Sequence, residues 1–207
     1  MASRARTHPP RPHPLTRVNL VDRANAGLQR AWEKSWLPEP ALDPEELWSI
    51  VAKPLKAEAD RFETAGRDPE DIADFRDRLR RLTDSANSEA QLNPLGRTMA
   101  HGQLIRSIRR RLGFGKLWHE RPEMARTTLA PPIIVIGHMR SGTTRIHRLL
   151  AADPAHCSTR FCDSWHPVPT WPDMWAFWGG LNLMIALYFN PWIDAIHPLS
   201  SGRVEEE

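Results

Sequence analysis

Apolar residues in the first half of the chain recur at helical spacing behind three similar start signals. Residues 43–44, 68–69 and 93–94 each place an Asp or Asn before a proline, which is typical of an N-cap followed by the first helical position. The spacing of the apolar residues that follow predicts three helices. The predicted core-facing positions are Leu47, Ile50, Val51 and Leu55; Ile72, Phe75, Leu79 and Leu82; and Leu95, Met99, Ile105, Ile108 and Leu112. We expect Pro54 to kink or shorten the first helix, and Gly113 and Gly115 to end the third.

The polar positions of the third predicted helix are rich in arginine. The residues are Arg97, Arg106, Arg109, Arg110 and Arg111. Two interpretations stay open. The run is a solvated face that also compensates the C-terminal helix dipole, or it forms a basic wall facing a polyanionic ligand.

The hydrophobic pattern changes at residues 133–136, which read Ile-Ile-Val-Ile without alternation. A short β-branched run of this kind predicts a strand buried on both faces of a parallel sheet. It is the only strong strand signal in the chain, yet an isolated strand leaves backbone groups unpaired at both edges. We therefore expect the chain to be the N-terminal part of a longer enzyme, or a truncated reading frame.

A phosphate-binding loop is predicted between this strand and the next helix. Gly137 and Gly142 have the spacing of the nucleotide-hydrolase loop, but Thr143 replaces its lysine. The cation comes earlier, as Arg140, whose planar guanidinium suits bidentate contact with oxygen atoms. Backbone N–H groups at the turn and the positive end of the helix dipole favour an anion there. Ser141 and Thr144 add hydroxyl groups, and the helix should end near residues 153–154.

The stretch GHMRSGTTRIHRLLAADP resembles the 5′-phosphosulfate loop of sulfotransferases, and is closest to the bacterial sulfotransferase-like and tyrosylprotein sulfotransferase branch. The resemblance implies a P-loop-like α/β fold and sulfuryl transfer from 3′-phosphoadenosine 5′-phosphosulfate to a hydroxyl or amine, without a metal. It also implies a small-molecule or protein acceptor. By the same resemblance, the 5′-phosphosulfate is held by Arg140, Ser141, Gly142, Thr143 and Thr144.

The resemblance extends over about residues 93–207 and offers a catalytic base. Asp163 falls on the glutamate of a Trp-Glu pair in that branch, with Cys162 in the tryptophan's place. A hydroxyl acceptor must lose its proton during transfer, so a base is needed within hydrogen-bond reach. We expect Asp163 to be this base, with His166 and His138 as rivals. Arg140 would stabilise the charge that develops during transfer.

Composition bears on three further questions: nucleic-acid binding, the redox setting and membrane association. A net charge of +3 is too small to indicate nucleic acid binding, and two cysteines are too few for a disulfide framework, which favours a reducing, cytoplasmic setting. The uncharged residues 174–193 are long enough to span a bilayer, but internal Asn, Gly and Pro favour a buried or interface helix over membrane association. The tryptophans around this segment could line an acceptor pocket or simply pack in a core or lid.

Together these patterns predict three regions. Residues 1–20 form a disordered, proline-rich basic tail, residues 21–130 a helical lead-in, and residues 131–207 the first part of a sulfotransferase α/β domain. Two alternatives to a sulfotransferase remain. One is a P-loop kinase or nucleotide hydrolase, which would need Mg²⁺ and a lysine. The other is an inactive truncated chain that acts only as an interaction module.

Overall fold

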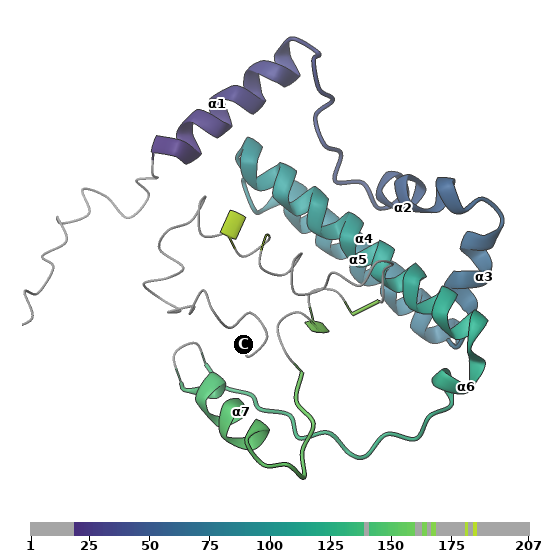
Figure 1. Ribbon diagram of the computed structural model, residues 1–207. Coiled ribbons are helices and arrows are strands. Elements are labelled where there is room, and N and C mark those ends of the chain that lie inside the picture. Colours follow the sequence, from purple (N-terminus) through teal and green to yellow (C-terminus); the bar gives the residue numbers. More distant parts are fainter. Residues whose placement is uncertain are drawn as a thin grey trace, which may run out of the picture.

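A computed structural model describes residues 19–138, 141–159, 163–164, 167–168, 181 and 184–185 (Figure 1). The described elements are helices. Their bounds are α1 Asn19–Glu33, α2 Pro44–Ala52, the short 3₁₀ helix η1 Lys53–Leu55, α3 Glu58–Thr64, α4 Pro69–Ser88, α5 Pro94–Glu120, α6 Pro122–Ala125 and α7 Thr143–Ala151. The predicted tail lies outside the described residues, except that α1 already begins at Asn19.

The three predicted helix starts are confirmed, each with the expected cap. The side chains of Asp43, Asp68 and Asn93 accept hydrogen bonds from the N–H three residues on, at 2.8, 2.8 and 2.7 Å. Each cap satisfies one of the N–H groups that a helix start leaves without a partner. The effect predicted for Pro54 is also confirmed, because α2 gives way at Lys53 to a single 3₁₀ turn.

The expected end of the third helix was wrong. Helix α5 continues through Gly113 and Gly115 as far as Glu120. A side chain at Gly115 would overlap the backbone carbonyl of Phe62 in α3. The glycine therefore serves close packing between two helices, and tertiary contact outweighs its low helix propensity.

Helix α5 is the centre of the bundle, and it packs against α1, α2 and α3 (Figure 1). Leu47 of α2 and Ile108 and Leu112 of α5 are fully buried. The other buried core residues are Leu42, Trp48, Val51, Phe62, Leu79, Leu104 and Ile105. The helical spacing correctly predicted most of these core residues. It also predicted Ile50, Leu82 and Met99, which are exposed.

Ion pairs reinforce the bundle where charges approach the core. The guanidinium of Arg76 in α4 donates two hydrogen bonds of 2.9 Å to the carboxylate of Glu63 in α3, which is 7% exposed. The same guanidinium lies over the Trp48 ring of α2, 3.4 Å from its centroid. One arginine thereby joins three helices through a bidentate ion pair and a cation–π contact.

The buried strand predicted at residues 133–136 is not formed within the described residues. No strand pairs with this segment within the described ranges, and Ile133, Ile134 and Ile136 are 59%, 73% and 87% exposed. The segment belongs to an extended connection that leads from α6 to α7, which lies apart from the bundle (Figure 1). A parallel strand needs neighbours to pair its backbone groups, and the described residues supply none.

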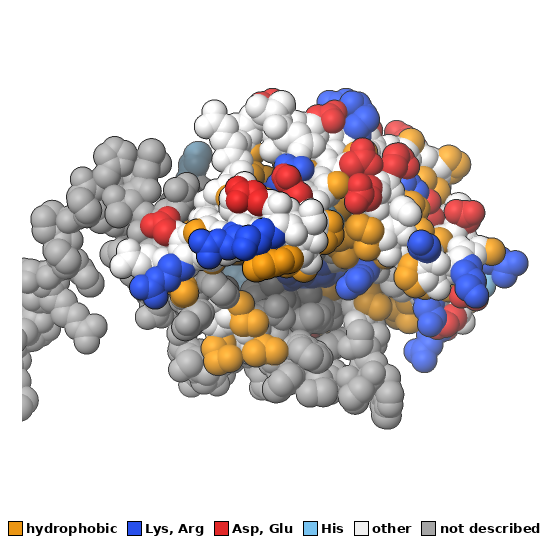
Figure 2. Space-filling view, turned by 90° about the horizontal axis from the view of Figure 1, so that it is seen from above, with side chains coloured by type: hydrophobic (Ala, Val, Ile, Leu, Met, Phe, Trp, Pro, Cys, Tyr) orange, Lys and Arg blue, Asp and Glu red, His pale blue; other side chains and the backbone are white. Residues whose placement is uncertain are grey.

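The described surface of the bundle mixes both charges. On the face seen in Figure 2, acidic and basic side chains are interspersed over the helices. In the described residues, no helix is long and apolar enough to cross a membrane, and most of residues 174–193 lies outside them.

Candidate functional site

The predicted loop leads directly into α7, which begins at Thr143 as expected and ends at Ala151, close to the predicted stop. Ahead of the helix, the N–H of Ser141 donates to the carbonyl of His138 at 3.1 Å and closes a tight turn. The first helical bond runs from the N–H of Ile146 to the carbonyl of Gly142, also at 3.1 Å. The N–H groups of residues 143–145 therefore have no acceptor within the helix.

The two loop glycines are favoured for different reasons, Gly142 by its backbone conformation and Gly137 by the side chains around it. Gly142 has φ 86° and ψ 18°, a left-handed conformation that residues with side chains rarely adopt. A side chain at Gly137 would collide with the hydroxyl of Ser141 and lie 2.9 Å from Cγ2 of Thr143. The chain is folded tightly enough at this point to bring the two ends of the turn together.

The groups that surround this turn suit an anion. Ser141, Gly142 and Thr144 are exposed and Thr143 is half-buried, so hydroxyl groups and helix-start N–H groups are within reach of solvent. The described side chains include none that caps α7. Free N–H groups at the positive end of a helix dipole are the usual setting for a bound phosphate or sulfate. Arg140, the predicted cation of the loop, lies outside the described residues.

The candidates for the base are only partly described. Asp163 is half-buried and makes at least one hydrogen-bonding or electrostatic contact. His138 is exposed at the end of the extended connection, whereas His166 and Cys162 lie outside the described residues. The structure therefore gives Asp163 a partly desolvated environment, without bringing it together with the loop in any described contact.

Val168, which follows Asp163 closely in sequence, lies at one face of α5. The side chain of Val168 packs against Gly113, where an added Cβ would lie 3.1 Å from Cγ1 of Val168. Arg110 and Arg106 lie on the same face, about one and two turns before Gly113. Burial lowers the pKa of both guanidinium groups, and the charge of Arg106 lowers the pKa of Arg110 further.

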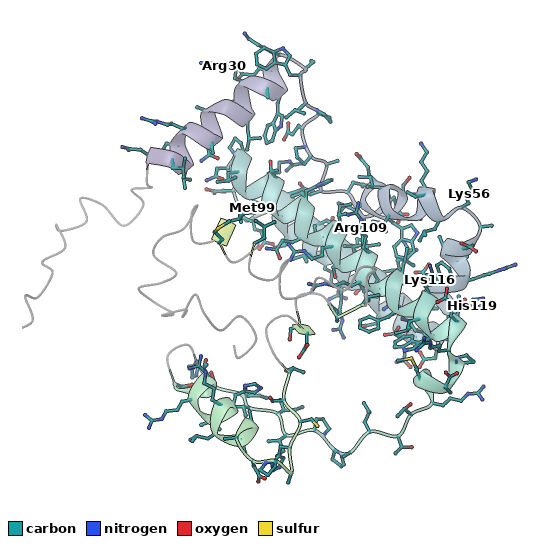
Figure 3. All side chains as sticks on the ribbon, viewed as in Figure 1. Arg30, Lys56, Met99, Arg109, Lys116 and His119 are labelled. Carbon is teal, nitrogen blue, oxygen red and sulfur yellow. The ribbon has the colours of Figure 1, made fainter. Side chains whose placement is uncertain are left out.

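The arginine run of α5 is therefore not a uniformly solvated face. Arg106 and Arg110 are half-buried, and Arg111 is only 10% exposed. Arg109 remains exposed, and it lies on α5 with Lys116 and His119 (Figure 3). Sequence spacing alone missed this division, because it depends on which segments pack over each side of the helix.

No group of three or more His, Cys, Asp or Glu side chains that could hold a metal ion occurs in the described part of the chain. Cys157 is an exposed free thiol.

Comparison with known protein families finds a match for about a third of the chain. Residues 131–201 match the model of the sulfotransferase family, so the resemblance noted in the sequence is confirmed for this region. The match begins at the extended connection and includes the loop, α7 and Asp163. It supports sulfuryl transfer as the general chemistry and a transferase as the class of protein. No curated protein and no solved structure matches the chain significantly.

Proposed function

We propose that this chain takes part in sulfuryl transfer from 3′-phosphoadenosine 5′-phosphosulfate to a hydroxyl or amine acceptor, with residues 140–144 holding the 5′-phosphosulfate. The observation that carries the proposal is the left-handed Gly142 at the start of α7, inside the region that matches the sulfotransferase family. The free N–H groups and the hydroxyls around it are a set of neutral donors, which suits an anion without requiring a metal.

The proposed roles follow from the chemistry of transfer. Charge builds on the sulfuryl and bridging oxygens in the transition state, so fixed N–H donors and the guanidinium of Arg140 would stabilise it. Ser141, Thr143 and Thr144 would orient the donor through their hydroxyl groups. Asp163 would accept the acceptor's proton, and it lies in the region that matches the sulfotransferase family. His166 and His138 are the rivals for this step.

We further propose that residues 131–207 are the first part of an α/β domain whose remaining strands would pair with residues 133–136. Ile133, Ile134 and Ile136 are exposed, and no strand among the described residues pairs with the backbone of this segment; both observations support the proposal. Added strands would bury the isoleucine side chains and satisfy the backbone groups together. The N-terminal helices α1 to α6 would then be a separate lead-in that packs through its own core.

Binding of the donor product tests the loop. Adenosine 3′,5′-bisphosphate should bind in the presence of a chelator, and calorimetry should show affinity falling about tenfold or more in Arg140→Ala, the effect of one lost charge-assisted contact. Arg126→Ala is the matched control, because Arg126 is exposed on the connection ahead of the loop. Unchanged affinity in Arg140→Ala would argue against the assignment, and an absolute need for Mg²⁺ would favour a P-loop kinase or hydrolase.

Turnover tests the base. In an active form that includes this chain, Asp163→Asn should remove most sulfuryl transfer while donor binding stays nearly intact, because the amide cannot accept a proton. If activity survives Asp163→Asn and is lost in His166→Ala, the base is His166 and not Asp163.

A further inference from the structure

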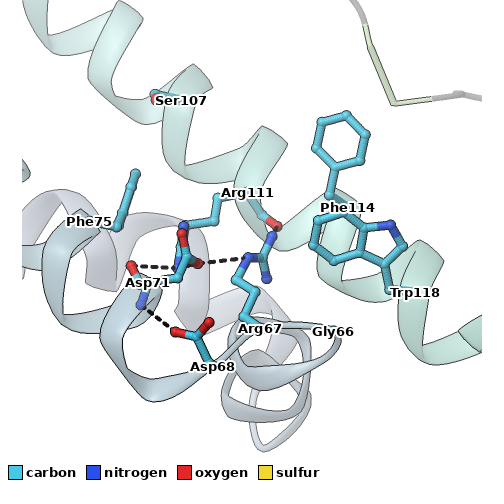
Figure 4. Close-up of a pocket in the computed structure, with 9 residues that line it drawn as sticks. All are labelled: Gly66, Arg67, Asp68, Asp71, Phe75, Ser107, Arg111, Phe114 and Trp118. Carbon is cyan, nitrogen blue, oxygen red and sulfur yellow. Dashed lines mark hydrogen bonds and ion pairs between the residues drawn. The ribbon is translucent and has the colours of Figure 1, made fainter. Parts of the chain in front are cut away.

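A groove of about 530 Å³ lies in the helical bundle, outside the region that matches the sulfotransferase family. It opens between the turn that joins α3 to α4 and one side of α5 (Figure 4). Two arginines form its floor, Arg67 from the turn and Arg111 from α5, and aromatic rings line its sides. None of these residues has a role in the function proposed above.

The two arginines are unusually buried for cations. The side chains of Arg67 and Arg111 are 7% and 10% exposed. Arg67 is fixed by backbone carbonyls, because its guanidinium donates to the carbonyls of Phe62 and Glu63 at 3.0 Å and to that of Arg111 at 2.8 Å. Burial of a guanidinium costs free energy unless anions compensate its charge.

The described anions only partly compensate this charge. A single carboxylate oxygen, Oδ2 of Asp71, faces both arginines, 2.8 Å from Arg111 Nη2 and 3.6 Å from Arg67 Nε. Asp68 already accepts the capping hydrogen bond from the N–H of Asp71. The pKa of Arg67 is lowered, first by burial and then by the charge of Arg111. Among the described residues, Nε of Arg111 is buried and has no hydrogen-bond partner.

The walls of the groove are flat and apolar. Trp118 lies against Arg67, with the guanidinium 4.7 Å from the ring centroid, and Phe75 lies 4.3 Å from the guanidinium of Arg111. Phe114 stacks on Trp118 with ring centroids 5.7 Å apart. Aromatic faces beside an incompletely paired guanidinium match a ligand that has a planar ring at one end and a negative charge at the other.

We propose that this groove binds a planar aromatic anion, with its carboxylate or sulfate group at Arg111 and its ring against Phe114 and Trp118. The bound anion would supply the acceptor that Nε of Arg111 lacks, after a small shift of the side chain toward the groove. Asp71 would continue to hold the second guanidinium nitrogen. The proposal stands independently of the phosphosulfate loop, since it rests on residues of α3, α4 and α5 and the turn between them.

Calorimetry on the 207-residue chain tests the charge requirement with naphthoate and its uncharged analogue naphthamide. We expect naphthoate to bind about tenfold or more tightly, the effect of one charge-assisted contact. Equal affinity for the two probes, or no detectable binding of naphthoate, would overturn the proposal.

Two variants locate the probe. Arg111→Gln should abolish the preference for naphthoate, while Arg78→Gln, on the exposed face of α4, should leave it unchanged. Because Arg111→Gln also removes a contact with Asp71, Ser107→Trp provides a test that keeps both arginines. Ser107 is exposed and lines the groove, so an indole there should fill the space and weaken naphthoate binding about tenfold or more. Wild-type affinity in Ser107→Trp, with circular dichroism unchanged, would show that the probe binds elsewhere.

Discussion

Replacing either of two glycines of α5 by alanine should change the free energy of unfolding, upward at Gly102 and downward at Gly115. Gly102 is exposed, and a Cβ added there meets nothing within 4 Å. Gly115 is buried, and a Cβ there would overlap the carbonyl oxygen and carbonyl carbon of Phe62. Both lie inside one helix, so helix propensity contributes equally at the two sites and only the tertiary contact differs.

The magnitudes follow from this difference. Alanine is favoured over glycine in a helix interior by about 1 kcal/mol, so Gly102→Ala should raise the free energy of unfolding by roughly that amount. At Gly115 the obstacle is backbone, which cannot rotate away as a side chain can, so α3 must move. Overpacking of this kind costs about 3 kcal/mol, which leaves Gly115→Ala destabilised by about 2 kcal/mol after the propensity gain.

Urea denaturation followed by far-UV circular dichroism measures both variants. The expected result is a higher midpoint for Gly102→Ala and a lower midpoint for Gly115→Ala, with similar slopes. If Gly115→Ala is stabilised as much as Gly102→Ala, α3 and α5 do not approach closely at Phe62, and the packing argument for this glycine fails.

Three further predictions concern stability and solubility. Asn93→Ala should lower the free energy of unfolding by about 1 kcal/mol in urea melts, because the N–H of Gly96 loses its cap; no loss would mean that water replaces the cap. Glu63→Gln should cost about 2 kcal/mol in the same assay, because it removes the charge that pairs with Arg76, which is itself 31% exposed; an effect near zero would refute a stabilising role. Ile134→Lys should reduce aggregation measured by light scattering, because Ile134 is 73% exposed. Unchanged scattering would show that this segment does not drive aggregation.

Features that depend only on neighbouring residues could be predicted before the fold was known. Three Asx-Pro dipeptides predicted three helix starts, because the cap and the proline act within one turn. The loop was predicted for the same reason. A left-handed glycine followed by two threonines fixes the start of α7 locally, and the region that matches the sulfotransferase family includes this motif.

Contacts between residues that are distant in sequence became visible only in the folded chain. The sequence suggested that Gly115 ends a helix, but in the structure α3 packs against it. The sequence left open whether the arginine run is a solvated face or a basic wall, and in the structure Arg111 is buried beside Asp71. Residues 133–136 are a second case in which the sequence pattern alone was not enough to predict the structure. Their β-branched pattern indicates a strand, but a strand is completed by hydrogen bonds to neighbours, and the described residues provide no neighbour. Local preference selects a backbone conformation, whereas burial and pairing depend on partners that are distant in sequence.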